Sequence, residues 1–428
     1  MSSTTAGTPF PAETMRYIRA QFAQLEHDAH GTARLFFENS GGSLRLRRAT
    51  ERAQEVSLCP ESTSRPNEAA QRLARVQHDG EADLLAFFGG EPSGALLHTA
   101  TASQAMFTVV RTITDNVPGT NIVTTAIEHP SSYDACARYA ERTGRELRVA
   151  EPDTSTGGID PAALAALVDT GTSLVSVIAT SNITGAITDI PAVVAAVRAK
   201  NPAVHIVTDA VQYAPHGVID AAGWGIDAVN IAPYKMFGDR GNAFTYLSPR
   251  LAALDHDRLA GAASTTWNIG SAAPAMYAGF TTIMDYLATI GGAAPEVGRR
   301  EAITAGLRAI HHHEQALLHT LLEGTTLRPG LRALPGVRVH FADQGIRARD
   351  LIVPLTFDNL SCADAVRAYG EHGIVVYERV ATSHYSARIL HALGLEGIVR
   401  VSPLHCHTVE EAEHFLAVTE KIARHAAG

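Results

Sequence analysis

The chain has 428 residues and is 46% hydrophobic, so it can bury a large core and is expected to divide into a large and a small domain. Its 35 Lys and Arg residues against 44 Asp and Glu residues give a formal net charge of −9, which argues against nucleic acid or an anionic membrane as a partner. Residues 1–8 are small and polar, and no apolar run reaches membrane-spanning length. We therefore expect a cytoplasmic protein.

The cysteine and histidine patterns predict no metal site. The cysteines lack a Cys-x-x-Cys spacing, so neither zinc nor a disulfide framework is indicated. They are Cys59, Cys136, Cys362 and Cys406. Successive residues on a helix point about 100° apart, so the run 311–313 of three histidines is interpreted as a solvated helix face.

The pattern of apolar residues predicts an α/β protein in three segments. Residues 1–35 are expected to be an N-terminal helical segment, residues 36–293 a large domain and residues 294–428 a small α+β domain. Between residues 95 and 247, apolar β-branched runs alternate with Ala-rich amphipathic stretches. This alternation predicts a mostly parallel sheet covered on both faces.

The first strand of the large domain, near Leu96–Thr99, runs through small residues into a helix that is expected to begin near Ala105. Small residues at a helix start let backbone N–H groups approach a phosphate, and the helix dipole favours the anion. Because Ser and Thr also cap ordinary helices, this pattern alone is weak evidence for a phosphate site. The evidence is stronger because the strand and helix belong to the same domain as Lys235.

Polar side chains follow the next two strands along the chain. His129 comes after the run 122–125, where an imidazole is able to stack on a flat aromatic cofactor; a hydrogen-bonded loop histidine is the commoner case. Asn182 comes after the strand 174–178 and would present an amide to a ligand, although an Asn that bonds its own backbone in a turn is the alternative.

Asp209 and Lys235 carry the strongest chemical signal. The run Val204–Val207 predicts a buried parallel strand that delivers Asp209 to the C-terminal edge of the sheet, where ligands bind. A second strand, Ala228–Ile231, ends near Lys235, so the two strand ends can be neighbours. A desolvated lysine can form a Schiff base, and a carboxylate keeps a cofactor ring nitrogen protonated. Taken alone, Asp209 suggests a helix cap and Lys235 an exposed turn lysine. The spacing of the two residues together favours a site for pyridoxal phosphate.

Arg400 lies inside the apolar strand 398–401, where an unpaired guanidinium would be costly. An anionic partner is therefore expected. A structural salt bridge or the carboxylate of an amino-acid substrate would each supply it, the latter through a bidentate contact.

Together these segments resemble the class V branch of fold type I pyridoxal phosphate enzymes, which contains cysteine desulfurases, selenocysteine lyases and isopenicillin N epimerase. The resemblance covers residues 36–421 and is most specific from Asp209–Gln212 to Lys235–Gly238. It implies a mostly parallel seven-stranded sheet in the large domain and pyridoxal 5'-phosphate as cofactor. It also implies an amino-acid substrate and a homodimer with shared active sites.

The resemblance implies a role for each matching position. Lys235 resembles the Schiff-base lysine, Asp209 the partner of the pyridine nitrogen and His129 the stacking residue. Further cofactor contacts would come from Ala102, Ser103, Gln104, Asn182, Gln212, Tyr234 and Ser271, the last of these reaching the neighbouring subunit's phosphate site. The substrate would meet Asn182, His384, Tyr385 and Arg400, with its carboxylate on Arg400.

Two departures from the family pattern bear on function. The usual Ser-x-His-Lys becomes Ala232–Lys235, so one hydroxyl ligand of the phosphate is absent and a phenol replaces an imidazole. Phosphate binding is then expected to depend on Ser271, Ser103 or Tyr234. Where a desulfurase carries its persulfide-forming cysteine, this chain has Thr382–Ser386, and a serine hydroxyl cannot take up sulfane sulfur as a thiolate does.

We therefore predict an enzyme that deprotonates Cα and catalyses β-elimination from a cysteine or S-substituted cysteine, a C–S lyase without an enzyme persulfide. Specialised metabolism is the pathway context we expect for it. Cys406 is expected to be a packing residue. Because the outcome depends on the substrate and on loop groups such as His384, Tyr385 and Arg379, an aminotransferase, an epimerase and a decarboxylating oxidative deaminase remain open. A binding protein that keeps the fold without catalysis is the alternative from another class, and the intact lysine, aspartate and arginine argue against it.

Overall fold

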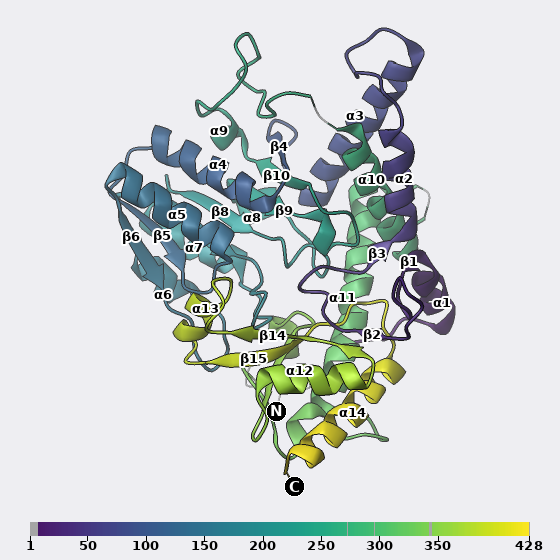
Figure 1. The fold of residues 1–428 in the computed structure, drawn as a ribbon. Helices are drawn as coiled ribbons and strands as arrows, with labels where there is room; N and C mark the ends of the chain where they lie inside the picture. The colour runs from purple at the N-terminus through teal and green to yellow at the C-terminus, as the bar shows by residue number, and fades with distance from the viewer. Residues whose placement is uncertain (1–6, 272, 295, 342–344, 428) are drawn as a thin grey trace.

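The centre of the molecule is a seven-stranded sheet with the strand order β4-β10-β9-β8-β7-β5-β6 (Figure 1). The computed structural model describes residues 7–271, 273–294, 296–341 and 345–427. Strand β10 is antiparallel to both of its neighbours, whereas the other adjacent pairs are parallel. The strands are β4 (Ala95–Thr99), β5 (Asn121–Thr125), β6 (Glu146–Ala150), β7 (Thr172–Ile178), β8 (His205–Asp209), β9 (Ala228–Ile231) and β10 (Ala243–Leu247). The predicted mostly parallel seven-stranded sheet is confirmed.

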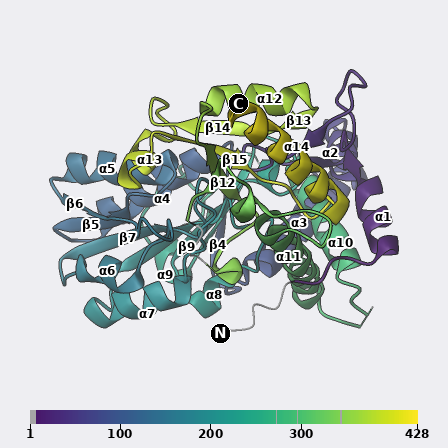
Figure 2. The same cartoon turned by 90° about the horizontal axis from the view of Figure 1, so that it is seen from below.

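Helices cover both faces of this sheet. The central strands β5, β7, β8 and β9 are buried at every residue, as expected for strands enclosed on two sides. Helices α4 and α5 lie on one side of the sheet and α6, α7 and α8 on the other (Figure 2). These helices are α4 (Ala102–Asn116), α5 (Pro130–Thr143), α6 (Pro161–Ala166), α7 (Ile190–Lys200) and α8 (Ala221–Trp224).

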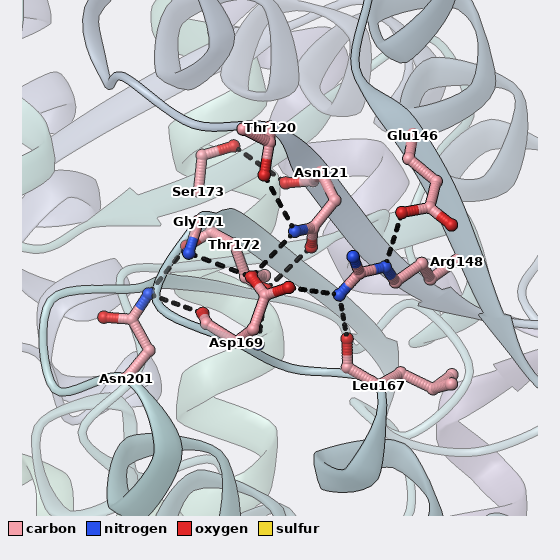
Figure 3. A network of polar contacts seen from close by, with 10 residues as sticks. All are labelled: Thr120, Asn121, Glu146, Arg148, Leu167, Asp169, Gly171, Thr172, Ser173 and Asn201. Carbon is pink, nitrogen blue, oxygen red and sulfur yellow. Dashed lines mark hydrogen bonds and ion pairs between the residues drawn. The ribbon is translucent and has the colours of Figure 1, made fainter.

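A polar network joins strands β5, β6 and β7 at their amino ends (Figure 3). Asn121 donates to Asp169 Oδ1 at 2.9 Å and accepts from Thr172 Oγ1 at 2.7 Å. Arg148 Nη1 donates to Asp169 Oδ2 at 2.8 Å, and Asn201 Nδ2 donates to the Thr172 carbonyl at 2.9 Å. Hydrogen bonds from Arg148 and then Asn121 lower the pKa of Asp169 to about 2. The network therefore fixes the register of three neighbouring strands.

The C-terminal part forms a four-stranded sheet in the order β11-β12-β15-β14. Its elements are β11 (Val337–Val339), β12 (Val353–Phe357), β14 (Tyr377–Val380), β15 (Gly397–Val401), α12 (Cys362–Glu371), α13 (Ala387–Ala392) and α14 (Val409–Ala427). The N-terminal strand β2 (Leu35–Phe36) pairs in parallel with β13 (Ile374–Val375), and Phe37 joins the apolar cluster of this region. Segments from the two ends of the sequence thus share one core. The domain boundaries at residues 36 and 294 remain predictions.

The remaining elements connect the two sheets or precede them. They are α1 (Ala12–Gln21), β1 (Phe22–Ala23), β3 (Arg45–Leu46), α2 (Arg47–Ser57), α3 (Glu68–Phe88), η1 (Pro233–Lys235), α9 (Pro249–Ala252), α10 (Pro274–Ile290), α11 (Arg299–Glu323), η2 (Leu331–Ala333) and η3 (Ile346–Ala348). The first predicted segment, residues 1–35, therefore contains one helix and short strands among its described residues, rather than helix throughout.

The interpretation of residues 311–313 as a solvated helix face is wrong for His313. Helix α11 packs against α14, so the His313 ring is buried, with its centroid 4.8 Å from that of Phe10. Its Nε2 lies 2.9 Å from the His407 carbonyl oxygen. Across the described residues, no cluster of three His, Cys, Asp or Glu side chains is arranged to hold a metal ion. Within the same residues, no helix has the length and apolar content needed to cross a membrane.

Candidate active site

A cavity of about 520 Å³ lies at the carboxyl ends of the parallel strands. Its wall is built from the loops that follow β4, β5, β7, β8 and β9 and from β14 of the smaller sheet. Parallel strands present their carboxyl ends at one edge, so side chains far apart in sequence meet there. The predicted site residues that line the cavity are Ala102, Ser103, His129, Asn182, Asp209, Gln212, Tyr234, Lys235 and Tyr385.

Asp209 is the buried acid of the cavity. It is the last residue of β8, and its carboxylate accepts from Ser132 Oγ and from the Val211 N–H, each at 3.0 Å. Burial raises the pKa of Asp209. Among the described residues, no cationic side chain forms an ion pair with it, so the carboxylate is suited to a positively charged ring nitrogen of a ligand.

Lys235 lies in the turn η1 that follows β9, and its side chain is buried next to the N-terminal segment. Its amine donates a hydrogen bond to the Ser40 carbonyl. Burial lowers the pKa of Lys235 to about 7, and the positive charges of Arg400 and Arg379 act in the same direction. A large fraction of the amine is therefore neutral at neutral pH, which is the form that attacks an aldehyde.

The start of α4 offers free backbone donors. Thr101 caps the helix by accepting from the Gln104 N–H at 3.1 Å, and the helix begins at Ala102 rather than near Ala105. The N–H groups of Ala102 and Ser103 belong to the first turn, where no intrahelical acceptor exists, and both residues line the cavity. Such a helix start suits a phosphate.

Hydroxyl groups cluster beside this helix start. Ser103 Oγ lies 2.6 Å from Ser131 Oγ, and Thr101 and Ser131 both line the cavity. Sequence reasoning did not select Thr101 or Ser131, although Thr101 precedes Ala102 and Ser131 lies two positions after His129. They offer hydroxyls in the cavity where Ala232 has none.

His129 forms a flat wall of the cavity and also caps α5. Its Nδ1 accepts from the Ser131 N–H at 3.2 Å, and its ring centroid lies 6.4 Å from that of Tyr385 with an interplanar angle of 29°. Burial, and then the charge of Lys235, lower the pKa of His129 to about 4. The ring is therefore neutral at physiological pH and is suited to stacking on an aromatic ligand.

Gln212 is held from behind by a buried ion pair. Its Nε2 lies 3.4 Å from His216 Nε2, and His216 Nδ1 lies 2.8 Å from Glu314 Oε2. Burial opposes a charge on His216, but the Glu314 carboxylate outweighs it and raises the pKa of His216 to about 9. A protonated imidazole can only donate, so it favours the orientation in which the Gln212 oxygen accepts and the NH2 group can donate into the cavity.

Arg400 has a partner within the chain. Its Nη2 lies 2.6 Å from Glu38 Oε1, and its Nη1 donates to the Asn182 carbonyl at 2.8 Å. The side chain is completely buried and does not line the cavity. The structural salt bridge left open by the sequence is thus present, and the predicted substrate contact of Arg400 remains a prediction.

Tyr234 takes the position of the family's imidazole next to the lysine. Its half-buried ring lines the cavity, and the Arg240 guanidinium carbon lies 4.3 Å from the ring centroid. Arg240 also donates to the Gly41 carbonyl at 3.3 Å. The phenol is therefore held between the cavity and an exposed arginine.

Besides Arg400, three predicted site residues lie outside the cavity. Gln104 is exposed, and its N–H is already bonded to Thr101. His384 is exposed and packs its ring on Tyr385 at a centroid distance of 3.9 Å. Ser271 is exposed in a loop, and its predicted contact with a second subunit remains a prediction. Ser386 is buried and donates to the Val380 carbonyl at 2.8 Å, so it closes the loop.

Arg379 and Asn242 line the cavity. The sequence analysis named Arg379 only as a loop group that affects the outcome of the reaction, and it did not select Asn242. Arg379 follows two residues after Tyr377 on β14, so the period of two for strand faces puts it on the same face as Tyr377. Tyr377 is paired with Arg400, and this pairing would have pointed to Arg379.

The cavity fits pyridoxal phosphate by its donor set. It combines a desolvated lysine, a buried carboxylate without a cationic partner among the described residues, a neutral flat ring and a helix start with free N–H groups. The fold and this site define a pyridoxal phosphate-dependent enzyme of fold type I. The chain belongs to the class-V aminotransferase family, which matches residues 35–415.

Individual relatives agree with this assignment. The chain is 26% identical over 420 residues to "Probable cysteine desulfurase 2" of Mycobacterium leprae, with 94% of each chain covered. It is 27% identical over 314 residues to "Aminotransferase-like protein FGM3" of Gibberella zeae, covering 71% of this chain and 73% of that protein. The apo structure of a cysteine desulfurase from Thermococcus onnurineus superposes with a TM-score of 0.79 at 20% identity, covering 98% and 100% of the two chains.

Proposed function

We propose that the protein is a C–S lyase that removes the sulfur substituent of a cysteine or S-substituted cysteine. In the overall reaction one water is consumed, the Cα–H and Cβ–S bonds break, and a thiol, pyruvate and ammonium form without net oxidation or reduction. The sulfur atom leaves with the electron pair of the Cβ–S bond and a proton.

The residues of the cavity support this chemistry. Bound pyridoxal phosphate supplies an electron sink for the charge that develops at Cα. Lys235 Nζ, with its pKa lowered to about 7, is suited to accept the Cα proton and to pass one on. Asp209 would hold the pyridine nitrogen, His129 the ring face, and Ala102 and Ser103 the phosphate.

The observation that carries the proposal is the absence of a thiol at the site. All four cysteines lie in the described part of the chain, and none lines the cavity. Burial raises the pKa of Cys136 to about 12 and that of Cys406 well above its usual value, so both thiols are inert. Without a nearby thiolate, sulfur has no acceptor on the protein and would leave with its substituent.

The test is product analysis with the purified holoenzyme. L-cysteine, S-methylcysteine, S-carboxymethylcysteine and alanine are supplied one at a time, and pyruvate, ammonia and free thiol are quantified. Equal amounts of pyruvate and thiol from a cysteine derivative, with Lys235→Ala inactive, are expected. The proposal is wrong if no cysteine derivative gives pyruvate and a different product appears.

Aminotransfer is the second candidate, because one relative is named aminotransferase-like. An aminotransferase converts its cofactor to pyridoxamine phosphate when it is given the amino donor alone. Loss of the visible cofactor band with donor alone, and its return on addition of a keto acid, would favour this candidate.

Two further features belong to the proposal. We infer that the protein works as a homodimer in which Ser271 of each subunit approaches the other's phosphate site, and that it acts in the cytoplasm. Sedimentation analysis of the holoenzyme tests the first of these.

A further inference from the structure

Arg388 joins the C-terminal part of the chain to the loop that carries His129. It is the second residue of α13, which lies near the start of α5 (Figure 2). Its Nη1 donates to the Ala126 carbonyl, and its Nη2 donates to the Glu128 carbonyl at 2.6 Å. Both acceptors belong to the loop between β5 and α5, directly before His129. The guanidinium therefore connects two segments that lie far apart in the sequence.

The surroundings of Arg388 stabilise its charge without an ion pair. The guanidinium carbon lies 3.9 Å from the centroid of the Tyr133 ring, and the negative face of such a ring attracts a cation. Asp134 is exposed, so water and salt screen its charge. Burial, and then the charge of Asp209, raise the pKa of the Glu128 carboxyl to about 8, so this group is mostly neutral at neutral pH. Two backbone carbonyls and one ring face thus hold the half-buried cation.

The segment 381–386, between β14 and α13, is closed by its own hydrogen bonds. Ser386 Oγ donates to the Val380 carbonyl at 2.8 Å. The N–H groups of Ser386 and Ala387 donate to the Ser383 carbonyl at 2.9 and 2.8 Å. These bonds connect the segment to the first turn of α13, so the docking of α13 determines where the segment lies.

Tyr385 is the residue of this segment that lines the cavity. Its side chain is 52% exposed, and its ring centroid lies 6.4 Å from that of His129. Aromatic contacts of an exposed ring are weak individually and leave the ring free to move unless its backbone is held in place. Arg388 supplies such an anchor, because it binds the loop on which His129 is carried.

We propose that Arg388 is a positioning residue that docks the segment 381–386 onto the loop carrying His129 and thereby holds Tyr385 in the wall of the cavity. Tyr385 in this place restricts the approach of molecules to the bound cofactor. Without the guanidinium, the two loop carbonyls lose their donor and α13 loses its contact with the loop. This role goes beyond the proposed function, because access to the cavity does not depend on which bond of the substrate breaks.

The first experiment measures the docking itself, by hydrogen exchange and mass spectrometry of the cofactor-free protein and of the holoenzyme. Arg388→Met keeps an unbranched side chain and removes the donors, whereas Arg388→Lys keeps the charge and loses the planar fork. Arg367→Met is the matched control, because Arg367 is 72% exposed on α12 and pairs with Asp364 of the same helix.

We expect Arg388→Met to raise the exchange rates of residues 381–387 and 126–133 by about 10-fold, and Arg388→Lys to raise them less. The control and the rest of the chain should exchange as in the wild type. The inference is overturned if either segment of Arg388→Met keeps the wild-type rate. If Arg388→Met raises exchange throughout the chain, Arg388→Lys is judged by the same criterion.

The second experiment measures access to the cofactor of the holoenzyme with phenylhydrazine, a bulky reagent that attacks the aldehyde carbon of bound pyridoxal phosphate and shifts its visible absorption. We expect Arg388→Met to raise the second-order rate constant by about 10-fold when Tyr385 is present. In a Tyr385→Ala background, the same change should raise it by less than about twofold, because no ring is left to position.

An equal ratio of rate constants in the two backgrounds, unity included, would show that Arg388 does not act through Tyr385 and would overturn the inference. Phenylhydrazine is not an amino acid, so its reaction does not depend on the C–S lyase activity. A holoenzyme that gives the expected rates and yet releases no pyruvate from cysteine derivatives would refute the proposed function alone.

Discussion

The polar network at the amino ends of β5, β6 and β7 differs from the polar groups around the cavity in how many of its hydrogen bonds are made within the chain. At the amino ends of β5, β6 and β7, the side chains of Asn121, Asp169 and Thr172 bind one another, and Arg148 and Asn201 complete the network (Figure 3). At the carboxyl ends, polar atoms in or beside the cavity are buried without a partner. They include Asn182 Oδ1, Asn242 Oδ1 and Arg379 Nε.

The difference separates residues that hold the fold from residues reserved for a ligand. A buried polar group that is paired contributes to stability, whereas an unpaired one costs free energy until a ligand satisfies it. Variants at the amino edge should therefore lower the free energy of unfolding and leave kcat/KM unchanged. Variants at the carboxyl edge should lower kcat/KM and leave the free energy of unfolding unchanged.

The largest effect is expected for Lys235→Ala. The variant lacks the amine that attaches the cofactor, so the visible absorption band should disappear and kcat/KM should fall by at least about 10³-fold. Its unfolding in the absence of cofactor should remain close to that of the wild type, since a buried amine is removed. Absorption spectra, pyruvate assays and thermal melts test these expectations. A strongly lowered Tm of the cofactor-free variant would show that Lys235 also stabilises the fold.

At the opposite edge, Asn121→Ala should lower the free energy of unfolding by about 1–2 kcal/mol, because the buried Thr172 hydroxyl loses the amide oxygen to which it donates. Urea denaturation gives this value. The kcat/KM of the folded variant should stay within about twofold of the wild type. A large loss of activity at unchanged stability would contradict the division between the two edges.

The attachment of cofactor to the cofactor-free protein should depend on pH through Lys235. Only the neutral amine attacks an aldehyde, and its pKa is lowered to about 7, so the rate should rise about tenfold between pH 6 and pH 8 and then level off. Stopped-flow absorbance with added pyridoxal phosphate measures this rate. A rise that continues to pH 10 would mean that the lysine is not desolvated as the structure has it.

The smallest effect should come from the ion pair behind Gln212. The pKa of His216 is raised to about 9 by Glu314, so the stability that this pair contributes is fully present below about pH 6.5, the usual pKa of histidine, and is lost as the pH rises through about 9. The Tm difference between the wild type and His216→Asn should therefore shrink by a few degrees between pH 6.5 and pH 10. A difference that stays constant over this range would show that His216 is neutral.

Much of the sheet and part of the site could be predicted from the sequence. Asp209, His129 and Asn182 were identified because each follows an apolar strand, and parallel strands end at one edge. The orientation of Arg400 could not be predicted, because its partner Glu38 lies 362 positions away and no local pattern connects them. Arg379 was named only as a loop group, because no local pattern showed that it lies on a strand that borders the cavity.

Capping and helix packing account for the other differences. Gln104 lies outside the cavity because the helix begins at Ala102, with Thr101 as its cap, rather than near Ala105. A shift of a few positions moves a side chain to another face of the helix. His313 is buried because α14, near the end of the chain, covers α11. A run of three histidines gives no indication of that contact.

The pairing of β2 with β13 and of Glu38 with Arg400 bears on how the protein is made. During synthesis the segment 35–44 emerges early, but its strand partner and its counter-ion are translated more than 300 residues later. Long-range contacts of this kind slow folding and leave early segments exposed on the ribosome. The lysine, which donates to Ser40 of that segment, can thus acquire its full buried environment only after β13 and Arg400 have been translated.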